Sequence, residues 1–259
     1  MKLRPCIDIH NGAVKQIVGG SLKDAGDTAT ENFVSSKGGA YYSSLYKEKN
    51  LPGGHIILLN SASSPYYEAT KQVALDALSA YPGGMQIGGG INPDNALGFL
   101  EAGASHVIVT SYVFKDGQLD EDALKKMVSK VGRKRLVLDL SVRIKDGRYT
   151  ITTDRWQKYT NVELNEAVLT KLSESCDEFL VHAVDVEGKN SGIEINLLPI
   201  LLQSPIPVTY AGGVHSYEDI DILRISGKEK IDMTIGSALN IFGGQLDLDQ
   251  VIEKVDRGC

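Results

Sequence analysis

Short apolar runs rich in β-branched residues recur along this chain, with longer stretches of helical character between them. The runs are apolar on both faces, as is typical of parallel strands that helices cover. Eight runs predict strands: Leu3–Ile9, His55–Leu59, Met85–Gly88, His106–Thr110, Arg135–Leu140, Phe179–Val184, Pro207–Ala211 and Ile231–Ile235.

The stretches between these runs predict helices. In Asp120–Val131, the residues Leu124, Met127, Val128 and Val131 follow the i, i+3, i+4, i+7 spacing of an amphipathic helix. The other predicted helices are Pro65–Ala80, Pro93–Ala102, Asn161–Ser175, Glu194–Leu202, Tyr217–Ile225 and Leu248–Val255. Between residues 21 and 46 a diglycine interrupts the pattern, and we expect a mobile first loop that leads into a helix.

Eight strand–helix units without a linker predict an α/β protein with a (β/α)8 TIM barrel, formed as a single domain over residues 1–259. An open doubly wound sheet is the alternative. Matching segments recur in the two halves. The offset is 131 residues between Asp8 and Asp139 (139 − 8) and 123 between Ile87 and Tyr210 (210 − 87). These offsets predict an internal two-fold repeat, with half-barrels of roughly 1–131 and 132–259.

Two aspartates are the strongest candidates for catalysis. Asp8 lies near the end of the first predicted strand and Asp139 near the end of the fifth. Functional groups in this fold lie at the carboxyl ends of the strands, and strands one and five are opposite each other. Taken alone, each aspartate is as compatible with a structural role, as a hydrogen-bonded strand end or a helix cap, as it is with a catalytic one. The matched pair favours a general acid and a general base that act on one substrate.

Small residues follow four of the predicted strands and suit anion binding. A diglycine lets the backbone approach a ligand closely and turns N–H groups towards it, and a nearby hydroxyl adds a donor. An isolated diglycine is usually only a turn, but here each recurs beside a partner from the next strand. The candidate phosphate-binding residues are Gly89, Gly90, Thr110 and Ser111 in the first half, and Gly212, Gly213, Gly236 and Ser237 in the second. Two such sets predict a substrate with two phosphates.

The remaining candidates are weaker, and a hairpin is predicted after the fifth strand. The turn 145–148 precedes the strand-like run Tyr149–Thr153. Trp156, the only tryptophan, follows this run and is either a stacking surface for a flat ligand ring or a packed residue. Arg143 is either a phosphate or substrate contact or a solvated side chain. His182, inside the sixth strand, is as compatible with packing as with function.

Composition and motifs narrow the function further. A net charge of −6 argues against binding of nucleic acid, which needs a basic face. No run approaches the roughly 18 apolar residues of a membrane span. The three cysteines are scattered, as expected of reduced thiols in the cytoplasm, or in the plastid stroma if a transit peptide has been removed. Metal-ligand clusters, nucleotide-binding loops and nucleophile elbows do not occur. We therefore expect proton transfer on a bisphosphorylated small molecule, without a metal or cofactor.

Several segments together carry a resemblance that runs nearly end to end. They are Pro5–His10, Gln86–Ile91, Val107–Ser111, Asp139–Ser141, Asp146–Arg148, Trp156-Gln157, His182–Gly188 and Tyr210–Gly213. With them the chain resembles the histidine-biosynthesis barrels with an internal half-barrel repeat. Within this family, it is most similar to the eukaryotic-type branch of the phosphoribosylformimino-5-aminoimidazole carboxamide ribotide isomerases.

The resemblance implies an Amadori rearrangement of an aminoaldose to an aminoketose. By the family's pattern, Asp139 protonates the ribose ring oxygen as general acid and Asp8 takes the C2′ proton as general base. Asp139 must then be protonated when substrate binds, and we expect burial to raise its pKa.

Two positions depart from the commoner bacterial pattern. Leu59-Asn60-Ser61 replaces an aspartate after strand two, and Asp185 is only a candidate replacement for a threonine of strand six. We expect these departures to affect substrate contacts more than mechanism.

The sister barrel, the cyclase that closes the imidazole ring with ammonia from a glutaminase partner, is the alternative function. It shares both aspartates and both phosphate sites. The hairpin with Trp156 favours the isomerase, and Cys6 beside Asp8 slightly favours the cyclase. An inactive barrel that only binds ligands, and an isomerase that also accepts phosphoribosylanthranilate, are further alternatives. For the isomerase we expect no obligate protein partner.

Overall fold

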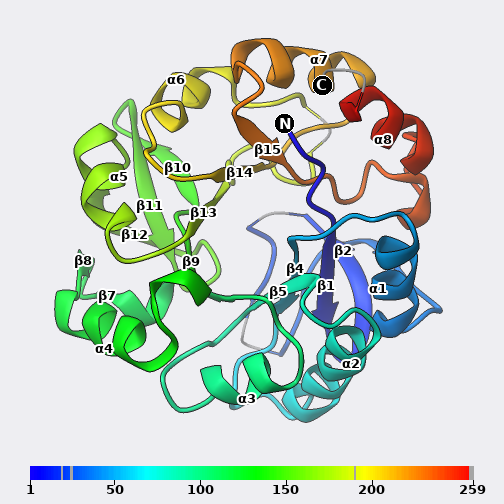
Figure 1. Ribbon diagram of the computed structural model, residues 1–259, viewed down its shortest axis with the longest axis horizontal. Coiled ribbons are helices and arrows are strands. Elements are labelled where there is room, and N and C mark those ends of the chain that lie inside the picture. Colours follow the sequence, from blue (N-terminus) through cyan, green and yellow to red (C-terminus); the bar gives the residue numbers. More distant parts are fainter. Residues whose placement is uncertain (19, 24–25, 190, 257–259) are drawn as a thin grey trace.

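Parallel strands close into a barrel that helices surround (Figure 1). This computed structural model describes residues 1–18, 20–23, 26–189 and 191–256. In chain order the strands are β1 Cys6–His10, β4 Gly54–Leu58, β5 Met85–Gly88, β6 Val107–Val109, β9 Leu136–Asp139, β13 Glu178–His182, β14 Val208–Ala211 and β15 Ile231–Met233. Each pairs with the next in this order. The barrel closes where Leu3 bridges to Met233 and the Arg4 N–H donates to the Met233 carbonyl at 2.7 Å. All eight predicted strands and the barrel are confirmed.

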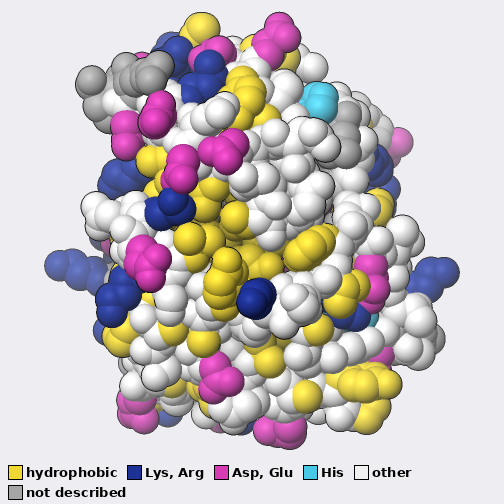
Figure 2. Space-filling view, turned by 90° about the vertical axis from the view of Figure 1, so that its right-hand side faces the viewer, with side chains coloured by type: hydrophobic (Ala, Val, Ile, Leu, Met, Phe, Trp, Pro, Cys, Tyr) yellow, Lys and Arg dark blue, Asp and Glu magenta, His cyan; other side chains and the backbone are white. Residues whose placement is uncertain are grey.

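The helices form the outer ring: α1 Gly39–Glu48, α2 Tyr67–Ala80, α3 Ala96–Glu101, α4 Glu121–Val131, α5 Glu166–Ser173, α6 Leu198–Leu201, α7 Tyr217–Ser226 and α8 Leu248–Asp256. Helix α4 confirms the predicted amphipathic stripe, because Leu124 and Met127 are buried. Its N-cap Asp120 accepts a hydrogen bond from the Ala123 N–H at 2.9 Å. On the outer side of the ring, near α8 and α1, acidic and basic side chains are interspersed with hydrophobic ones (Figure 2).

Two predicted helices are wrong in part. The prediction Asn161–Ser175 includes residues that belong to a strand, and α5 begins only after the N-cap Asn165, whose side chain accepts from the Val168 N–H at 3.0 Å. The prediction Glu194–Leu202 becomes the 3-10 turn η3 Ile195–Leu197 followed by the short α6. Three further 3-10 turns are η1 Ser111–Val113, η2 Arg133–Arg135 and η4 Asn240–Phe242.

Antiparallel strands extend the barrel at two places. After β1, the strands β2 Ala13–Ile17 and β3 Glu31–Val34 form an antiparallel extension. Strand β3 lies within the expected first loop of residues 21–46, so that prediction is wrong there; residues 24 and 25 lie outside the described ranges. The turn into β2 uses Asn11 and Gly12, with φ of 53° and 73°, as a two-residue hairpin requires. After β9, the predicted hairpin is confirmed and gains a third strand: β10 Val142–Lys145, β11 Arg148–Thr153 and β12 Lys158–Glu163. A small ribbon pairs β7 Phe114–Lys115 with β8 Gln118–Leu119.

The two ends of the barrel differ. At the amino ends of the strands, the buried Glu178 accepts hydrogen bonds from Thr209 Oγ1 at 2.7 Å and Gln86 Nε2 at 3.1 Å, and Arg4 lies 3.7 Å away. Above this polar layer, the apolar residues Ile57, Ile108, Val137, Leu180 and Ala211 fill the barrel interior. Ile57 and Ile108 also form part of the wall of a cavity at the carboxyl ends of the strands. The packed interior therefore leaves a site only at that end.

Candidate active site

Asp8 and Asp139 line one cavity of about 240 Å³ at the carboxyl ends of the strands. Asp8 lies in β1 and Asp139 ends β9, and three strands separate β1 from β9 in each direction around the barrel. The two carboxyl groups therefore stand on opposite walls of the mouth, as the sequence predicts. Among the residues that the structure describes, no cluster of three or more His, Cys, Asp or Glu side chains could hold a metal ion.

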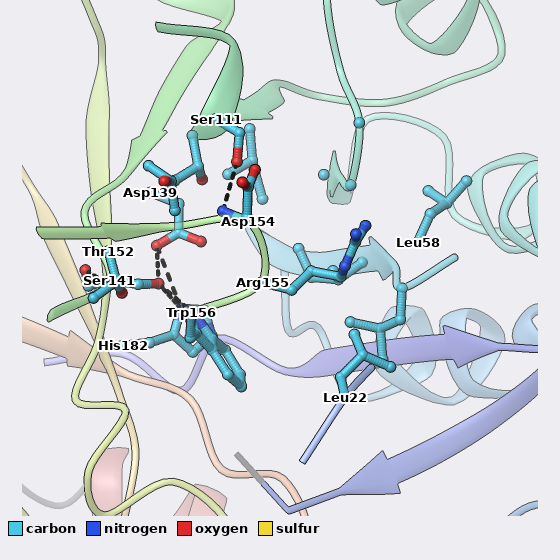
Figure 3. A pocket seen from close by; sticks show the side chains of 18 of the residues that line it. Leu22, Leu58, Ser111, Asp139, Ser141, Thr152, Asp154, Arg155, Trp156 and His182 are labelled. Atoms are coloured by element: carbon cyan, nitrogen blue, oxygen red, sulfur yellow. Dashed lines mark hydrogen bonds and ion pairs between the residues drawn. The ribbon is translucent and has the colours of Figure 1, made fainter. Parts of the chain in front are cut away.

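Asp139 belongs to a hydrogen-bonded cluster on one wall (Figure 3). The Ser141 hydroxyl donates to Asp139 Oδ1 at 2.6 Å, and Nδ1 of His182 lies 3.5 Å from the same oxygen. Trp156 reaches this cluster from the loop between β11 and β12, and its Nε1–H donates to the Ser141 hydroxyl at 3.0 Å. Its ring centroid lies 5.5 Å from that of His182. Trp156 thus contacts Ser141 and His182, the two neighbours of Asp139, besides lining the cavity.

The Asp139–His182 pair sets the charge of this wall. Burial alone would raise the pKa of Asp139, but the charge of His182 and the hydrogen bonds from His182 and Ser141 outweigh it and lower that pKa. Burial would likewise lower the pKa of His182, but Asp139 and the more distant carboxylates raise it to about 9. The expectation that burial raises the pKa of Asp139 is therefore wrong, because His182, predicted only as a weak candidate for a substrate contact, lies beside the carboxylate.

Asp8 has the opposite surroundings. Burial raises its pKa to about 7, and the nearby carboxylate of Glu187 adds to the rise, while His182 opposes it. Glu187 lies in the loop after β13, and burial raises its own pKa as well. No hydrogen bond to the Asp8 carboxyl group occurs among the described residues. Asp8 is therefore a carboxyl group that takes up a proton near neutral pH, as a general base should.

The first set of small residues lines the same cavity as the aspartates. Gly89, Gly90, Thr110 and Ser111 all belong to its wall. Gly89 has a φ of 97°, and a Cβ there would lie 2.1 Å from the Leu58 carbonyl, so only glycine fits. The Ser111 hydroxyl accepts a hydrogen bond from the Asp154 N–H at 3.1 Å and so also ties the Trp156 loop to this wall.

The second set lines a smaller adjoining cavity of about 30 Å³, formed in part by Gly212, Gly213, Gly236 and Ser237. A Cβ on Gly213 would lie 2.0 Å from the Gly192 carbonyl. In the barrel order β5 is opposite β14 and β6 is opposite β15, so the two sets face each other across the mouth. Asp8, His182 and Glu187 line both cavities and therefore mark where the two join.

Arg143 and Asp185 are placed differently from the other candidates. Arg143 Nε donates to Asp185 Oδ1 at 3.0 Å, and the Ile144 N–H donates to Asp185 Oδ2 at 2.9 Å. Neither residue belongs to the walls of the two joined cavities. They connect β10 to the loop after β13, so their interaction holds together the two segments that carry Trp156 and Glu187. As substrate contacts they are not supported by this placement.

The prediction missed four residues of the site: Ser141, Glu187, His55 and Arg155. His55 stacks edge-on against His182 with 5.9 Å between ring centroids. Arg155 lines the larger cavity, and its side chain points away from Trp156 (Figure 3). Ser141 and Glu187 stand two and five residues beyond Asp139 and His182, so proximity to strand ends was a usable signal for both. His55 and Arg155 have no comparable signal in the sequence.

Residues 2–247 match the sequence model of a protein family that is described as histidine biosynthesis protein. The chain belongs to this histidine biosynthesis protein family. Among relatives of the chain are proteins named 1-(5-phosphoribosyl)-5-((5-phosphoribosylamino)methylideneamino)imidazole-4-carboxamide isomerase. The one from Medicago truncatula, named as chloroplastic, is 53% identical over 97% of this chain and 81% of its own length. Those from Yarrowia lipolytica and Neurospora crassa are 43% and 41% identical, over 94% and 97% of this chain and 93% and 97% of their own lengths. The family and its eukaryotic members confirm the resemblance seen in the sequence.

Proposed function

We propose that this chain is the isomerase of histidine biosynthesis that rearranges N′-(5′-phosphoribosylformimino)-5-aminoimidazole-4-carboxamide ribonucleotide from an aminoaldose to an aminoketose. The observation that carries the proposal is the joined pair of cavities, with a set of small residues at each end and two opposed aspartates near the middle. A long substrate with a phosphate at each end matches this arrangement. The names of the relatives support the same reaction.

In the proposed mechanism, each aspartate moves one proton. Asp139 delivers a proton to the ribose ring oxygen, the bond from this oxygen to C1′ breaks, and an iminium forms. Asp8 then takes the proton from C2′, which gives an enolamine. C1′ gains a proton and the C2′ hydroxyl loses one, so the ketone forms and no co-reactant is consumed. C1′ is reduced and C2′ oxidised within one molecule, which makes the enzyme an aldose–ketose isomerase of the intramolecular oxidoreductase type.

The proposed function also fits the predictions on binding partners, cofactors, location and domain organisation. The partner is the bisphosphorylated small molecule, and an obligate protein partner, a metal and a cofactor are not part of the proposed mechanism. No helix in the described part of the chain is long and apolar enough to cross a membrane. We place the enzyme in the cytoplasm, or in the plastid stroma as for the Medicago relative. One catalytic domain with half-barrels of roughly 1–131 and 132–259 stays a prediction.

The decisive experiment incubates the purified chain with the aminoaldose substrate, without ammonia and without a glutaminase. The proposal expects formation of the aminoketose. Strict dependence on ammonia would instead indicate the cyclase, and binding without turnover would indicate an inactive barrel. The buried Cys6 thiol gives the cyclase no added support, because burial raises its pKa well above the ordinary value. A parallel assay with phosphoribosylanthranilate tests whether the enzyme also accepts that substrate.

A further inference from the structure

His182 stands at the junction of the two cavities and lines both of them. It is the last residue of β13, and its side chain is almost fully enclosed, with 11% of its surface exposed. In a substrate that spans both cavities, the rearranging ribose therefore lies close to this imidazole.

The contacts of His182 form a short route for a proton. Nδ1 lies 3.5 Å from Asp139 Oδ1 and 3.4 Å from the Ser141 hydroxyl, and that hydroxyl donates to the same Asp139 oxygen at 2.6 Å. The indole N–H of Trp156 donates to the Ser141 hydroxyl, which fixes the direction of this hydroxyl. The imidazole and the carboxyl group are thus joined both directly and through Ser141.

Charged groups approach His182 from several elements. Three carboxyl groups influence it: Asp139 from β9, Asp8 from β1 and Glu187 from the loop after β13. His55 from β4 packs against its ring, and burial lowers the pKa of His55 to about 3, so this neighbour is uncharged. Arg155 lines the larger cavity from the hairpin. The surrounding carboxyl groups favour the imidazolium form of His182.

The source of the proton that Asp139 delivers needs an explanation, because the lowered pKa of Asp139 means that this group is ionised in the ligand-free enzyme. An ionised carboxylate cannot give a proton to the ribose oxygen. A proton held on a neighbouring base removes the difficulty, provided that the base is connected to the carboxylate and stays charged at neutral pH.

We propose that His182 stores the proton that Asp139 delivers to the ribose ring oxygen. This proposal rests on the proposed isomerase function. The proton passes from Nδ1 of His182 to Asp139, directly or through Ser141, and from Asp139 to the ring oxygen as its bond to C1′ breaks. When the enolamine collapses, the proton of the C2′ hydroxyl returns to the Asp139–His182 pair. Asp8 passes the proton taken from C2′ to C1′, so every group ends in its starting state.

The first test needs no substrate and is therefore independent of the proposed function. The five histidines can be followed by NMR in labelled protein during a pH titration, and the resonance missing in His182→Gln identifies His182. We expect His182 to stay protonated up to about pH 9, and in Asp139→Asn we expect its titration to move to lower pH, because the largest cause that raises its pKa is removed. A midpoint near the ordinary value of 6.5 in both proteins would overturn the proposal. If His182→Gln does not fold, the titration with Asp139→Asn decides alone, because only one histidine should shift strongly.

The second test uses the pH dependence of turnover. In His182→Gln we expect kcat near pH 8 to fall by about 100-fold, as is usual for loss of a proton-transfer group. The alkaline limb should also move to lower pH, because Asp139 alone must then retain the proton. His106→Gln is the matched control, since this ring also approaches a carboxylate, Asp177 at 3.4 Å, but lies outside both cavities. It should behave like the unmodified protein.

A purely packing role of His182 would lower activity equally at every pH and leave the alkaline limb in place, and that result would overturn the proposal. Failure of the unmodified chain to convert the aminoaldose would refute the isomerase function instead. The histidine titration would still report whether the Asp139–His182 pair holds a proton.

Discussion

The two halves of the barrel supply equivalent aspartates in opposite electrostatic surroundings. Asp8 faces the carboxylate of Glu187, and its pKa rises to about 7. Asp139 faces His182, and its pKa falls below the ordinary value. The backbone positions repeat, but the proton affinities do not. An internal repeat therefore predicts where two catalytic groups stand without predicting which one gives and which one takes a proton.

The second strand of each half is the source of the difference. Asp8 pairs in register with Ile57 of β4, and Asp139 pairs in register with Leu180 of β13. Two residues further along are Leu59 in the first half and His182 in the second. The expectation that departures after strands two and six affect substrate contacts more than mechanism is thus not supported, because His182 and Glu187 shift the pKa values of both aspartates.

The largest effect should come from neutralising either aspartate. We expect Asp8→Asn and Asp139→Asn each to lower kcat by about 10³-fold, while substrate binding changes only a few-fold because the phosphate contacts remain. Steady-state kinetics and calorimetric titration would measure both quantities. Asp122→Asn, on the exposed side of α4, is the control and should keep full activity. Full activity in either active-site variant would refute the roles assigned to the pair.

Removal of the carboxylate beside Asp8 should make the two aspartates more alike. The pH profile of kcat/KM should rise as Asp8 ionises at about pH 7 and fall as His182 loses its proton at about pH 9. In Glu187→Gln the acid limb should move to lower pH, because a negative charge that raises the pKa of Asp8 is gone. Glu174→Gln, at the C-cap of α5, is the control. An unmoved acid limb would show that Glu187 does not influence Asp8.

The raised pKa of Asp8 should also cost stability. In the unfolded chain Asp8 has the ordinary pKa of 3.8, and in the folded protein its pKa is about 7. Between these values the unfolded state binds fewer protons, so the free energy of unfolding falls as the pH rises through this window. Asp8→Asn should therefore be more stable than the unmodified protein near pH 8, by on the order of 2 kcal/mol, and should lose this advantage below about pH 4. Denaturant unfolding at both pH values tests this, and an equal stability at pH 8 would contradict it.

The smallest effect should come from Trp156→Phe, which removes the indole donor to Ser141 but keeps an aromatic ring against His182. We expect a loss of a few-fold in kcat/KM, about the value of one hydrogen bond. Because Trp156 is the only tryptophan, its fluorescence should also change when ligand binds to the unmodified protein. No change in either measurement would place this loop outside the functional site.

Much of the fold could be predicted because parallel strands are buried on both faces and give long apolar runs. Antiparallel additions give weaker signals. Asn11-Gly12 was a readable hairpin turn before β2, but the polar strand β12 is only visible from its pairing with β11. Positions of the aspartates and glycines could also be predicted, since strand ends meet at one edge. The charged neighbour of each aspartate could not be predicted. The position of His182 beside Asp139 depends on the register of β13, and that of Glu187 near Asp8 depends on the course of its loop.

The opposite proton affinities of Asp8 and Asp139 are tested most directly by a titration of the two carboxyl groups themselves. Carbon-13 NMR of labelled aspartates in the ligand-free protein, assigned with Asp8→Asn and Asp139→Asn, reports each protonation state separately. We predict a midpoint of about pH 7 for Asp8 and a midpoint below the ordinary value of 3.8 for Asp139. Equal midpoints, or a higher midpoint for Asp139 than for Asp8, would contradict it.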